Sequence, residues 1–284
     1  MICVLGCTFN WNSITSSSDG SKLAAAELGG IYISTNGGES WTLTSAPSFY
    51  SWQSIASSSD GSKLVTAAQE GGVYISTNGG ASWYLTLLLP SLHYYSITSS
   101  SKGSKLVVAS AGKGIYISTN GGTSWTLTSA PSSSNWWSIT SSSDGSKLAA
   151  VVYSGGIYIS TNGGTSWTLT SAPSSSDWQS ITSSSDGSKL AAVVSGGGIY
   201  ISTNGGSSWT LTSAPSLSYL QYITSSSDGL KLAVVAYGGG IYISTDGGAS
   251  WILSLASSYI QSWQSITSSS NGRIIAAALH IHQH

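Results

Sequence analysis

The sequence predicts an all-β fold, a β-propeller of seven blades that occupies residues 1–284 as one domain. Three observations predict it. A motif of the form Ser-Thr-(Asn/Asp)-Gly-Gly-x-Ser-Trp occurs six times at intervals of 42 residues, starting at Ser34. A second motif, variants of Ser-Ile-Thr-Ser-Ser-Ser-Asp-Gly, occurs seven times. Between them, short apolar segments alternate with turn residues, which is typical of antiparallel strands joined by tight connections.

Each repeat divides into four expected strands, A to D, and residues 178–219 show the pattern. The expected strands are 178–182, 189–194, 199–202 and 209–212. Asp186-Gly187 turns the chain between A and B, because both residue types tolerate positive φ. Four antiparallel strands every 42 residues match a propeller blade, in which radial repetition leaves only short edges.

The two ends of the chain predict how the ring closes. The C-terminus supplies a seventh A–B pair, Trp263 to Ala278, without a C–D motif after it. Ile2 to Leu5 lies where strand D lies in the other units. We therefore expect six full blades and one composite blade of three strands, built from both termini. A stacked solenoid would need specialised end caps instead. Six blades with a spare hairpin is the alternative.

Composition excludes several partners. Charged residues make up 7% of the chain, against about 25% in ordinary globular proteins. The net charge is −1 and no basic patch is visible, so we expect no nucleic-acid partner. No apolar run approaches the ~20 residues of a membrane helix. Residues 1–10 lack the basic start of a signal peptide, although low charge and Ser/Thr richness are compatible with an extracellular setting.

The six-fold motif resembles the Asp-box, or BNR, repeat, Ser-x-Asp-x-Gly-x-x-Trp, on the hairpin between strands C and D. Five copies carry Asn where the repeat has Asp, and Asn keeps the side-chain oxygen that bonds the turn backbone. The resemblance implies a propeller and a structural role for these positions. They are Ser34, Asn36, Gly38, Trp41, Asn78, Trp83, Asn120, Trp125, Asn162, Trp167, Asn204, Trp209, Asp246 and Trp251.

Families with this repeat include sialidases, other glycoside hydrolases, sortilin-type receptors and assembly factors of photosystem II, so function has to be argued from sites. Sialidases use three arginines, whereas this chain has only Arg273, which we align with the lysines of the other units. Glu27 and Glu70, on the B–C loops of neighbouring blades, are the one plausible carboxylate pair of a glycoside hydrolase. Solvated loop acids explain them more simply. No cofactor or metal motif is visible, and we interpret His280, His282 and His284 as a frayed tail.

Differences between blades predict a binding face. Residues 136–177 and 178–219 differ at six positions, and five of these lie at the D–A or B–C end of the blade. The six pairs are Trp137/Gln179, Tyr153/Ser195, Ser154/Gly196, Thr165/Ser207, Ser175/Leu217 and Asp177/Tyr219. Loops on a rigid scaffold commonly carry binding residues, so we expect the D–A/B–C face to be functional.

That end also carries a ring of aromatic residues. Three residues before each strand-A isoleucine stand Trp11, Trp52, Tyr94, Trp136, Trp178, Leu220 and Trp263. The next position holds an amide or aromatic side chain, including Gln53, Trp137, Gln179 and Gln264. An aromatic ring beside an amide suits a sugar, and repeated weak sites gain by multivalency. Alternatively, each ring fills the gap between two blades.

These features predict a non-enzymatic recognition propeller that binds a glycan or a protein partner, with a multivalent lectin as the most specific version. The alternative is a structural or assembly subunit that buries apolar loop residues against a partner. The residues expected to be exposed for that purpose are Phe49, Leu88, Leu92, Leu217 and Ile260. The sequence does not assign a compartment.

Overall fold

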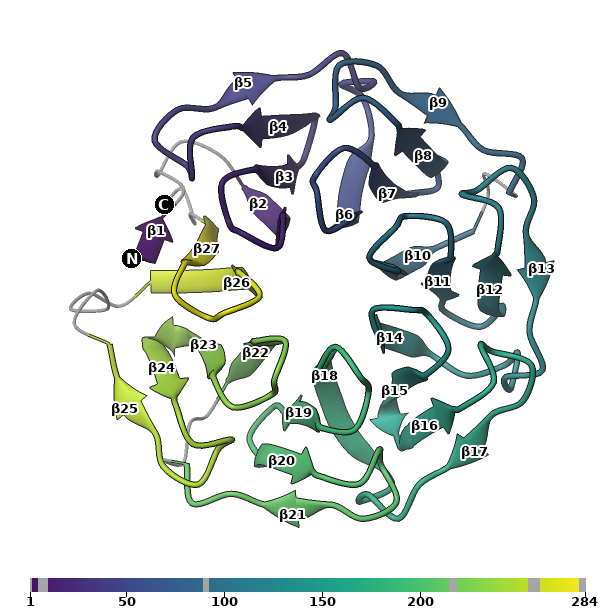
Figure 1. Ribbon diagram of the computed structural model, residues 1–284. Coiled ribbons are helices and arrows are strands. Elements are labelled where there is room, and N and C mark those ends of the chain that lie inside the picture. The colour runs from purple at the N-terminus through teal and green to yellow at the C-terminus, as the bar shows by residue number, and fades with distance from the viewer. Residues whose placement is uncertain (1, 5–9, 89–91, 215–218, 255–260, 281–284) are drawn as a thin grey trace.

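The computed structural model describes residues 2–4, 10–88, 92–214, 219–254 and 261–280. Its strands form sheets that are arranged radially around a central axis, and β1 and β27, the first and last strands, lie side by side in the ring (Figure 1). This confirms the predicted propeller. Within each blade the first strand lies innermost and the chain proceeds outward, so the strands are named A to D in that order.

Six blades have four antiparallel strands each. Blades 1 to 3 are β2–β5 (Trp11–Ser16, Leu23–Glu27, Gly30–Ser34, Thr42–Leu43), β6–β9 (Ser51–Ser57, Leu64–Gln69, Gly72–Ser76, Tyr84–Leu85) and β10–β13 (Tyr94–Ser99, Leu106–Ser110, Gly114–Ser118, Thr126–Leu127). Blades 4 to 6 are β14–β17 (Trp136–Ser141, Leu148–Gly155, Ile157–Ser160, Thr168–Leu169), β18–β21 (Ser176–Ser183, Leu190–Val194, Gly198–Ser202, Thr210–Leu211) and β22–β25 (Leu220–Ser225, Leu232–Gly239, Ile241–Ser244, Ile252–Leu253).

The seventh blade joins the two ends of the chain. It contains β26 (Gln261–Ser268), β27 (Ile275–His280) and β1 (Ile2–Val4). Strand β1 pairs in parallel with β27, in the register Ile2↔Ile275. As predicted, this N-terminal strand lies beside the C-terminal pair in one composite, three-stranded blade. It keeps the direction of a D strand but occupies the place of strand C, because β27 has no C strand to satisfy its outer edge.

Apolar packing lies between the blades. Among the described residues, the buried side chains form seven clusters, and each cluster takes residues from two neighbouring blades. The cluster that closes the ring combines Trp11 and Ile14 of blade 1 with Ala276 and Ala278 of blade 7. A single blade could not bury these side chains alone, so the ring stabilises each blade through its neighbours.

Lysine stems connect the A–B turns of successive blades. The Cβ and Cδ of Lys22 lie against Gly61 of the next turn, and the Lys22 ammonium donates to the carbonyl oxygen of Asp60 at 2.9 Å. At the closing junction the residue against Gly20 is Ile274. Ile274 therefore takes the place of lysine, and the alignment of Arg273 with the lysines is corrected by one residue.

Candidate partner-binding face

The two faces of the ring differ in charge. We call the surface formed by the D–A segments and B–C loops the loop face, and the surface formed by the A–B and C–D turns the turn face. Four charged residues lie in loop-face segments, namely Glu27, Glu70, Lys113 and Asp177. The remaining Asp, Glu, Lys and Arg residues lie on the turn face. The loop face instead exposes large apolar residues, which are Leu28, Phe49, Leu87, Tyr153 and Tyr219.

The aspartates of the A–B turns accept hydrogen bonds from residues of their own turns. Hydroxyl and backbone N–H groups of Ser17 and Ser21 donate to the Asp19 carboxylate and lower its pKa to about 2. A hydrogen bond from the Ser58 hydroxyl likewise lowers the pKa of Asp60. These contacts recur from blade to blade, so the aspartates stabilise turns.

The predicted aromatic platform does not exist as a surface. Trp11, Trp52, Tyr94, Trp136, Trp178, Leu220 and Trp263 all have at most 3% of their surface exposed. Trp136 packs edge-on against Tyr158 of its own blade, with ring centroids 5.2 Å apart. Trp52 and Tyr74 repeat this arrangement at 5.2 Å. These rings fill the gaps between blades, so stacking on a sugar is excluded for them.

The adjacent position of strand A is half-buried. In each A–B pair the register shifts at this residue, as between Trp136 and Ser138, which marks a β-bulge. A bulge re-aims one side chain, so Trp137 is half-buried while Trp136 is buried. The amides at this position make local bonds: Gln53 donates to the Ser51 hydroxyl at 2.8 Å, and Gln179 donates to the Asp177 carbonyl at 3.4 Å. Gln264 is half-buried as well.

Glu27 and Glu70 occupy different environments, so the carboxylate pair predicted for a hydrolase is not supported. Glu27 is 8% exposed at the end of β3. Burial raises its pKa above the ordinary value, and a hydrogen bond from Tyr32 only partly opposes this. Glu70 is exposed and lies 3.3 Å from Nε2 of His93. A glycosidase needs both acids to face one substrate.

The six Asp-box turns share one hydrogen-bond pattern. The backbone N–H of Gly38 donates to the Ser34 hydroxyl at 2.9 Å, and that hydroxyl donates to Oδ1 of Asn36. The Asn36 amide nitrogen then donates to the Ser40 hydroxyl at 2.8 Å. In the sixth box this last bond reverses, because Ser250 donates to the Asp246 carboxylate. Both amide and carboxylate therefore satisfy the turn, and the serine and Asn or Asp side chains of each box have their hydrogen bonds inside it.

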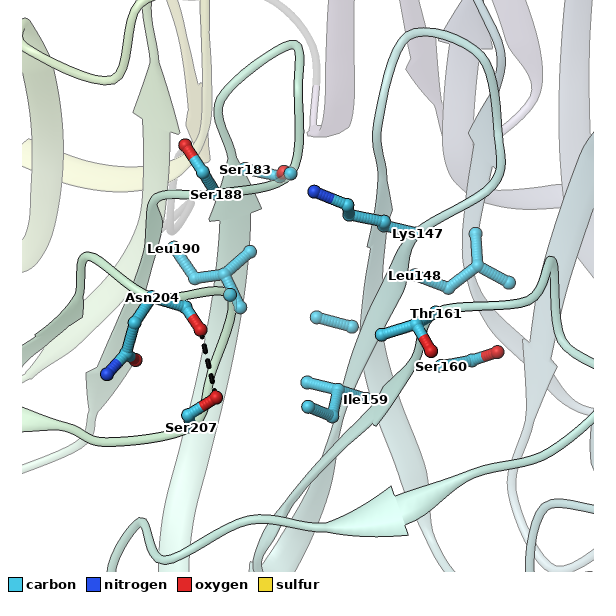
Figure 2. A pocket seen from close by; sticks show the side chains of 13 residues that line it. Lys147, Leu148, Ile159, Ser160, Thr161, Ser183, Ser188, Leu190, Asn204 and Ser207 are labelled. Carbon is cyan, nitrogen blue, oxygen red and sulfur yellow. Dashed lines mark hydrogen bonds between the residues drawn. The ribbon is translucent and has the colours of Figure 1, made fainter.

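Two crevices between blades on the turn face are smaller than most ligand pockets. One lies between blades 4 and 5, with Lys147 and Ile159 on one side and Ser188 and Asn204 on the other (Figure 2). Its volume is about 220 Å³, and the equivalent crevice between blades 5 and 6 has about 130 Å³. Ligand pockets usually have roughly 300–1,000 Å³. These crevices recur with the blade period, so we attribute them to blade packing.

On the loop face, four of the six positions that differ between blades 4 and 5 come together. Trp137 lies 5.3 Å from Tyr153, measured between ring centroids. Tyr153 pairs with Asp177 of the next blade, and the Ser154 hydroxyl donates to Oδ1 of Asp177 at 2.7 Å. Tyr95 of blade 3 extends the group, because it stacks on Trp137 at 4.6 Å and 25°. We call these five residues the blade-4 cluster.

Four members of this cluster, Tyr95, Tyr153, Ser154 and Asp177, were absent from the predicted ligand-binding set. Tyr153, Ser154 and Asp177 differ between otherwise matching blades, and that difference was the available signal. Their contact could not be foreseen, because β15 continues to Gly155 and pairs across the blade boundary with β18. A second such extension joins β23 to β26.

The set of exposed apolar residues also needs correction. Phe49 is exposed as expected, but Leu88 and Leu92 are buried between blades 2 and 3. Leu217, Ile260, His282 and His284 lie outside the described residues. Leu87, which is 90% exposed, takes the place of Leu88 on the surface.

Two further features concern metals and membranes. In the part of the chain that the structure describes, no three His, Cys, Asp or Glu side chains lie close enough to hold a metal ion. Within the same residues, no helix has the length and apolar character required to cross a bilayer.

Comparison with known proteins supports the repeat and the fold. The BNR/Asp-box repeat model matches residues 32–43. The predicted resemblance to the Asp-box repeat is confirmed. Among curated proteins, none matches the sequence significantly.

Solved structures share the architecture at low identity. YCF48 from Cyanidioschyzon merolae has a TM-score of 0.71 and 17% identity, covering 93% of this chain and 91% of that one. YCF48 bound to D1 peptide has a TM-score of 0.70 and 17% identity, covering 92% and 88%. An ancestral GH74 enzyme has a TM-score of 0.69 and 20% identity, covering 84% of this chain but 36% of the enzyme. These likenesses establish a propeller fold.

Proposed function

We propose that this chain is a non-enzymatic recognition propeller that binds a protein segment on its loop face, at the blade-4 cluster. The observation that carries the proposal is the contact between Trp137, Tyr153, Ser154 and Asp177. Unconstrained drift would scatter the differences between two blades over separate loops. Here four of the six differing positions form one contiguous group beside the inner strands.

Chemistry favours a protein partner over a sugar. The buried rings leave no repeated stacking platform, so the lectin version loses the multivalency on which it depended. The loop face is nearly uncharged and exposes Leu28, Phe49 and Leu87, which is typical of surfaces that contact proteins. A propeller of similar fold, YCF48, has been seen bound to a peptide. An assembly role is the broader form of the same proposal.

The experiment is selection of peptides from a displayed random library against the purified chain. The test variant is Trp137→Gln with Tyr153→Ser, because blade 5 carries Gln179 and Ser195 at these positions without loss of fold. We expect selected peptides to bind this variant at least tenfold more weakly. The matched control is Thr165→Ser with Leu230→Ser on the turn face, which copies Ser207 and Ser188 and leaves binding unchanged.

Selection of no peptide, or equal binding by the loop-face variant, would overturn the proposal. A glycan array run in parallel separates the remaining alternative. If the chain binds a glycan and the loop-face variant does not, the ligand of this face is a sugar and not a protein segment. Circular dichroism and the melting temperature establish that each variant is folded.

A further inference from the structure

We infer that the blade-4 cluster recognises a cationic side chain, arginine or lysine, in the bound segment. The inference rests on the proposed function and names the chemistry of its partner. It follows from an aromatic wall, an adjacent carboxylate with spare hydrogen-bonding capacity, and the absence of both in the neighbouring blade.

The aromatic wall comes from three strands of two blades. Tyr95 lies on β10, Trp137 on β14 and Tyr153 on β15. The rings of Tyr95 and Trp137 are nearly parallel at 4.6 Å, and Tyr153 follows at 5.3 Å with a tilt of 41°. Tyr153 is 38% exposed, so the wall reaches solvent. The faces of such rings are electronegative and attract a cation within about 6 Å of the centroid.

Asp177 places a carboxylate at the end of this wall. Its Cα pairs with that of Tyr153, and its Oδ1 accepts a hydrogen bond from Ser154 at 2.7 Å. Among the described residues, no side chain donates to Oδ2 and no basic side chain forms an ion pair with Asp177. Asp60 on the turn face differs, because Ser62 donates to both of its oxygens. Asp177 thus keeps an acceptor oxygen for a ligand.

A bound partner would shield Oδ2 of Asp177 from water, so the ligand itself has to supply a hydrogen-bond donor. An apolar side chain would cover the carboxylate and leave its Oδ2 without a hydrogen bond, which is unfavourable. A guanidinium or ammonium group instead donates to the carboxylate while its charge or stem lies against the rings. The chemistry therefore selects a cation.

The backbone at Ser154 supports this arrangement. Ser154 has a φ of 54°, a left-handed conformation, where blades 5 and 6 carry Gly196 and Gly238 with φ of 69° and 65°. Glycine fits that conformation best, but only serine supplies the hydroxyl that holds Asp177. Blade 5 lacks the whole group, with Gln179, Ser195 and Tyr219 at the positions of Trp137, Tyr153 and Asp177.

The test uses four pools of synthetic heptapeptides whose central residue is fixed as Arg, Lys, Gln or Leu and whose other positions are random. Binding of each labelled pool to the full chain is measured by fluorescence polarisation at low and high salt. We expect the Arg and Lys pools to bind at least fivefold more tightly than the Gln and Leu pools. That preference should fall as sodium chloride rises, because the attraction is partly ionic.

Asp177→Asn is the decisive variant, since it keeps the shape and the Ser154 hydrogen bond while removing the charge. It should abolish the preference for Arg and Lys. Asp246→Asn, on the turn face, is the matched control, because five other boxes already carry Asn. Equal binding of all pools, or an unchanged preference in Asp177→Asn, would overturn the inference while the proposed function stands. Binding of no pool would overturn both.

Discussion

The backbone N–H of Ser270 donates to the carbonyl oxygen of Ser18 at 2.7 Å, joining residues near opposite ends of the chain. The same bond links each A–B turn to the next, from Ser18 to Ser59 at 2.8 Å and onward around the ring. The Ser270–Ser18 bond makes this series a closed circle. The turn face is therefore one continuous hydrogen-bonded rim, which explains why its turns vary so little while the loop face varies.

Where the circle closes, Gly20 packs against Ile274 and leaves no room for a larger side chain at position 20. A Cβ on Gly20 would lie 2.9 Å from Cδ1 of Ile274, and Gly20 has a φ of +76°. We expect Gly20→Ala to lower the free energy of unfolding by about 1–3 kcal/mol, from strain at positive φ and crowding. Ile274→Lys should change it by less than about 1 kcal/mol, because Lys22 packs in the same way against Gly61. Urea denaturation measures both, and equal stability of Gly20→Ala and the wild type would contradict the crowding.

Asn204 tests the chemistry of the Asp-box turn. Its Oδ1 accepts from the Ser202 hydroxyl and from the Ser208 N–H, at 2.9 Å each. Asn204→Asp keeps both bonds and should be nearly neutral, as Asp246 indicates. Asn204→Ala removes the acceptor and should lower the free energy of unfolding by about 1–2 kcal/mol. Thermal melting of the two variants should therefore separate them, and identical melting temperatures would rule out a structural role for the oxygen.

The turn aspartates predict loss of stability in acid. Hydrogen bonds from serines lower the pKa of Asp19 to about 2, and the pKa of Asp60 and Asp186 shifts in the same direction. Because the folded pKa lies below the unfolded value of about 3.9, these carboxylates stabilise the fold above pH 4. That contribution is lost as the pH falls from about 4 through 2.

Melting temperature measured between pH 5 and pH 2 should therefore decline in that window. Asp186→Asn, which copies Asn271 of the seventh A–B turn, should weaken the dependence on pH. A flat profile for the wild type, or an unchanged slope in the variant, would contradict this assignment.

Tyr222 replaces a serine that other blades use as a hydrogen-bond acceptor. The equivalent Ser180 accepts from the N–H of Ile223 at 3.3 Å, whereas Tyr222 packs against the cluster containing Trp263 and Ile266. Tyr222→Ser could regain one hydrogen bond, worth about 1 kcal/mol, but it would open a cavity that costs about 3 kcal/mol or more. We expect a net loss of stability in chemical denaturation; a gain would show that the tyrosine is strained.

Glu70 combines local backbone strain with an exposed contact to His93, which is an ion pair only when the imidazole is protonated. Its φ is 57°, at a position where Gly112 has 66°, and its carboxylate lies 3.3 Å from His93. Relief of strain is worth about 1–2 kcal/mol and an exposed ion pair at most about 1 kcal/mol. Glu70→Gly should therefore be as stable as the wild type or more so, and Glu70→Ala should be less stable than Glu70→Gly. The reverse order of the two variants in urea would contradict this balance.

Local features of the sequence accounted for the propeller class, the four strands of a blade and the Asp-box turns. Strand D was expected over 209–212 and spans Thr210–Leu211, a small difference at an outer edge. These features depend on turn residues and on alternation within about ten positions, so they repeat with every blade.

Local sequence patterns did not predict the contacts between side chains of neighbouring blades. Trp136 and Trp137 are adjacent and alike in the sequence, yet one fills the space between blades and the other stacks on Tyr95. The β-bulge between these two residues forms only when strand A pairs with strand B, so the sequence alone does not show it.

The aromatic ring that the sequence marked by its period of 42 residues is thus core rather than surface. The sequence by itself determined the repeat, the turn chemistry and the face on which blades differ. Only the tertiary structure decided which side chains are buried, where β1 pairs, and that Trp137, Tyr153 and Asp177 lie together. The physical reason is that burial and pairing depend on residues of the next blade, about 40 positions away, whereas turns depend on their own residues.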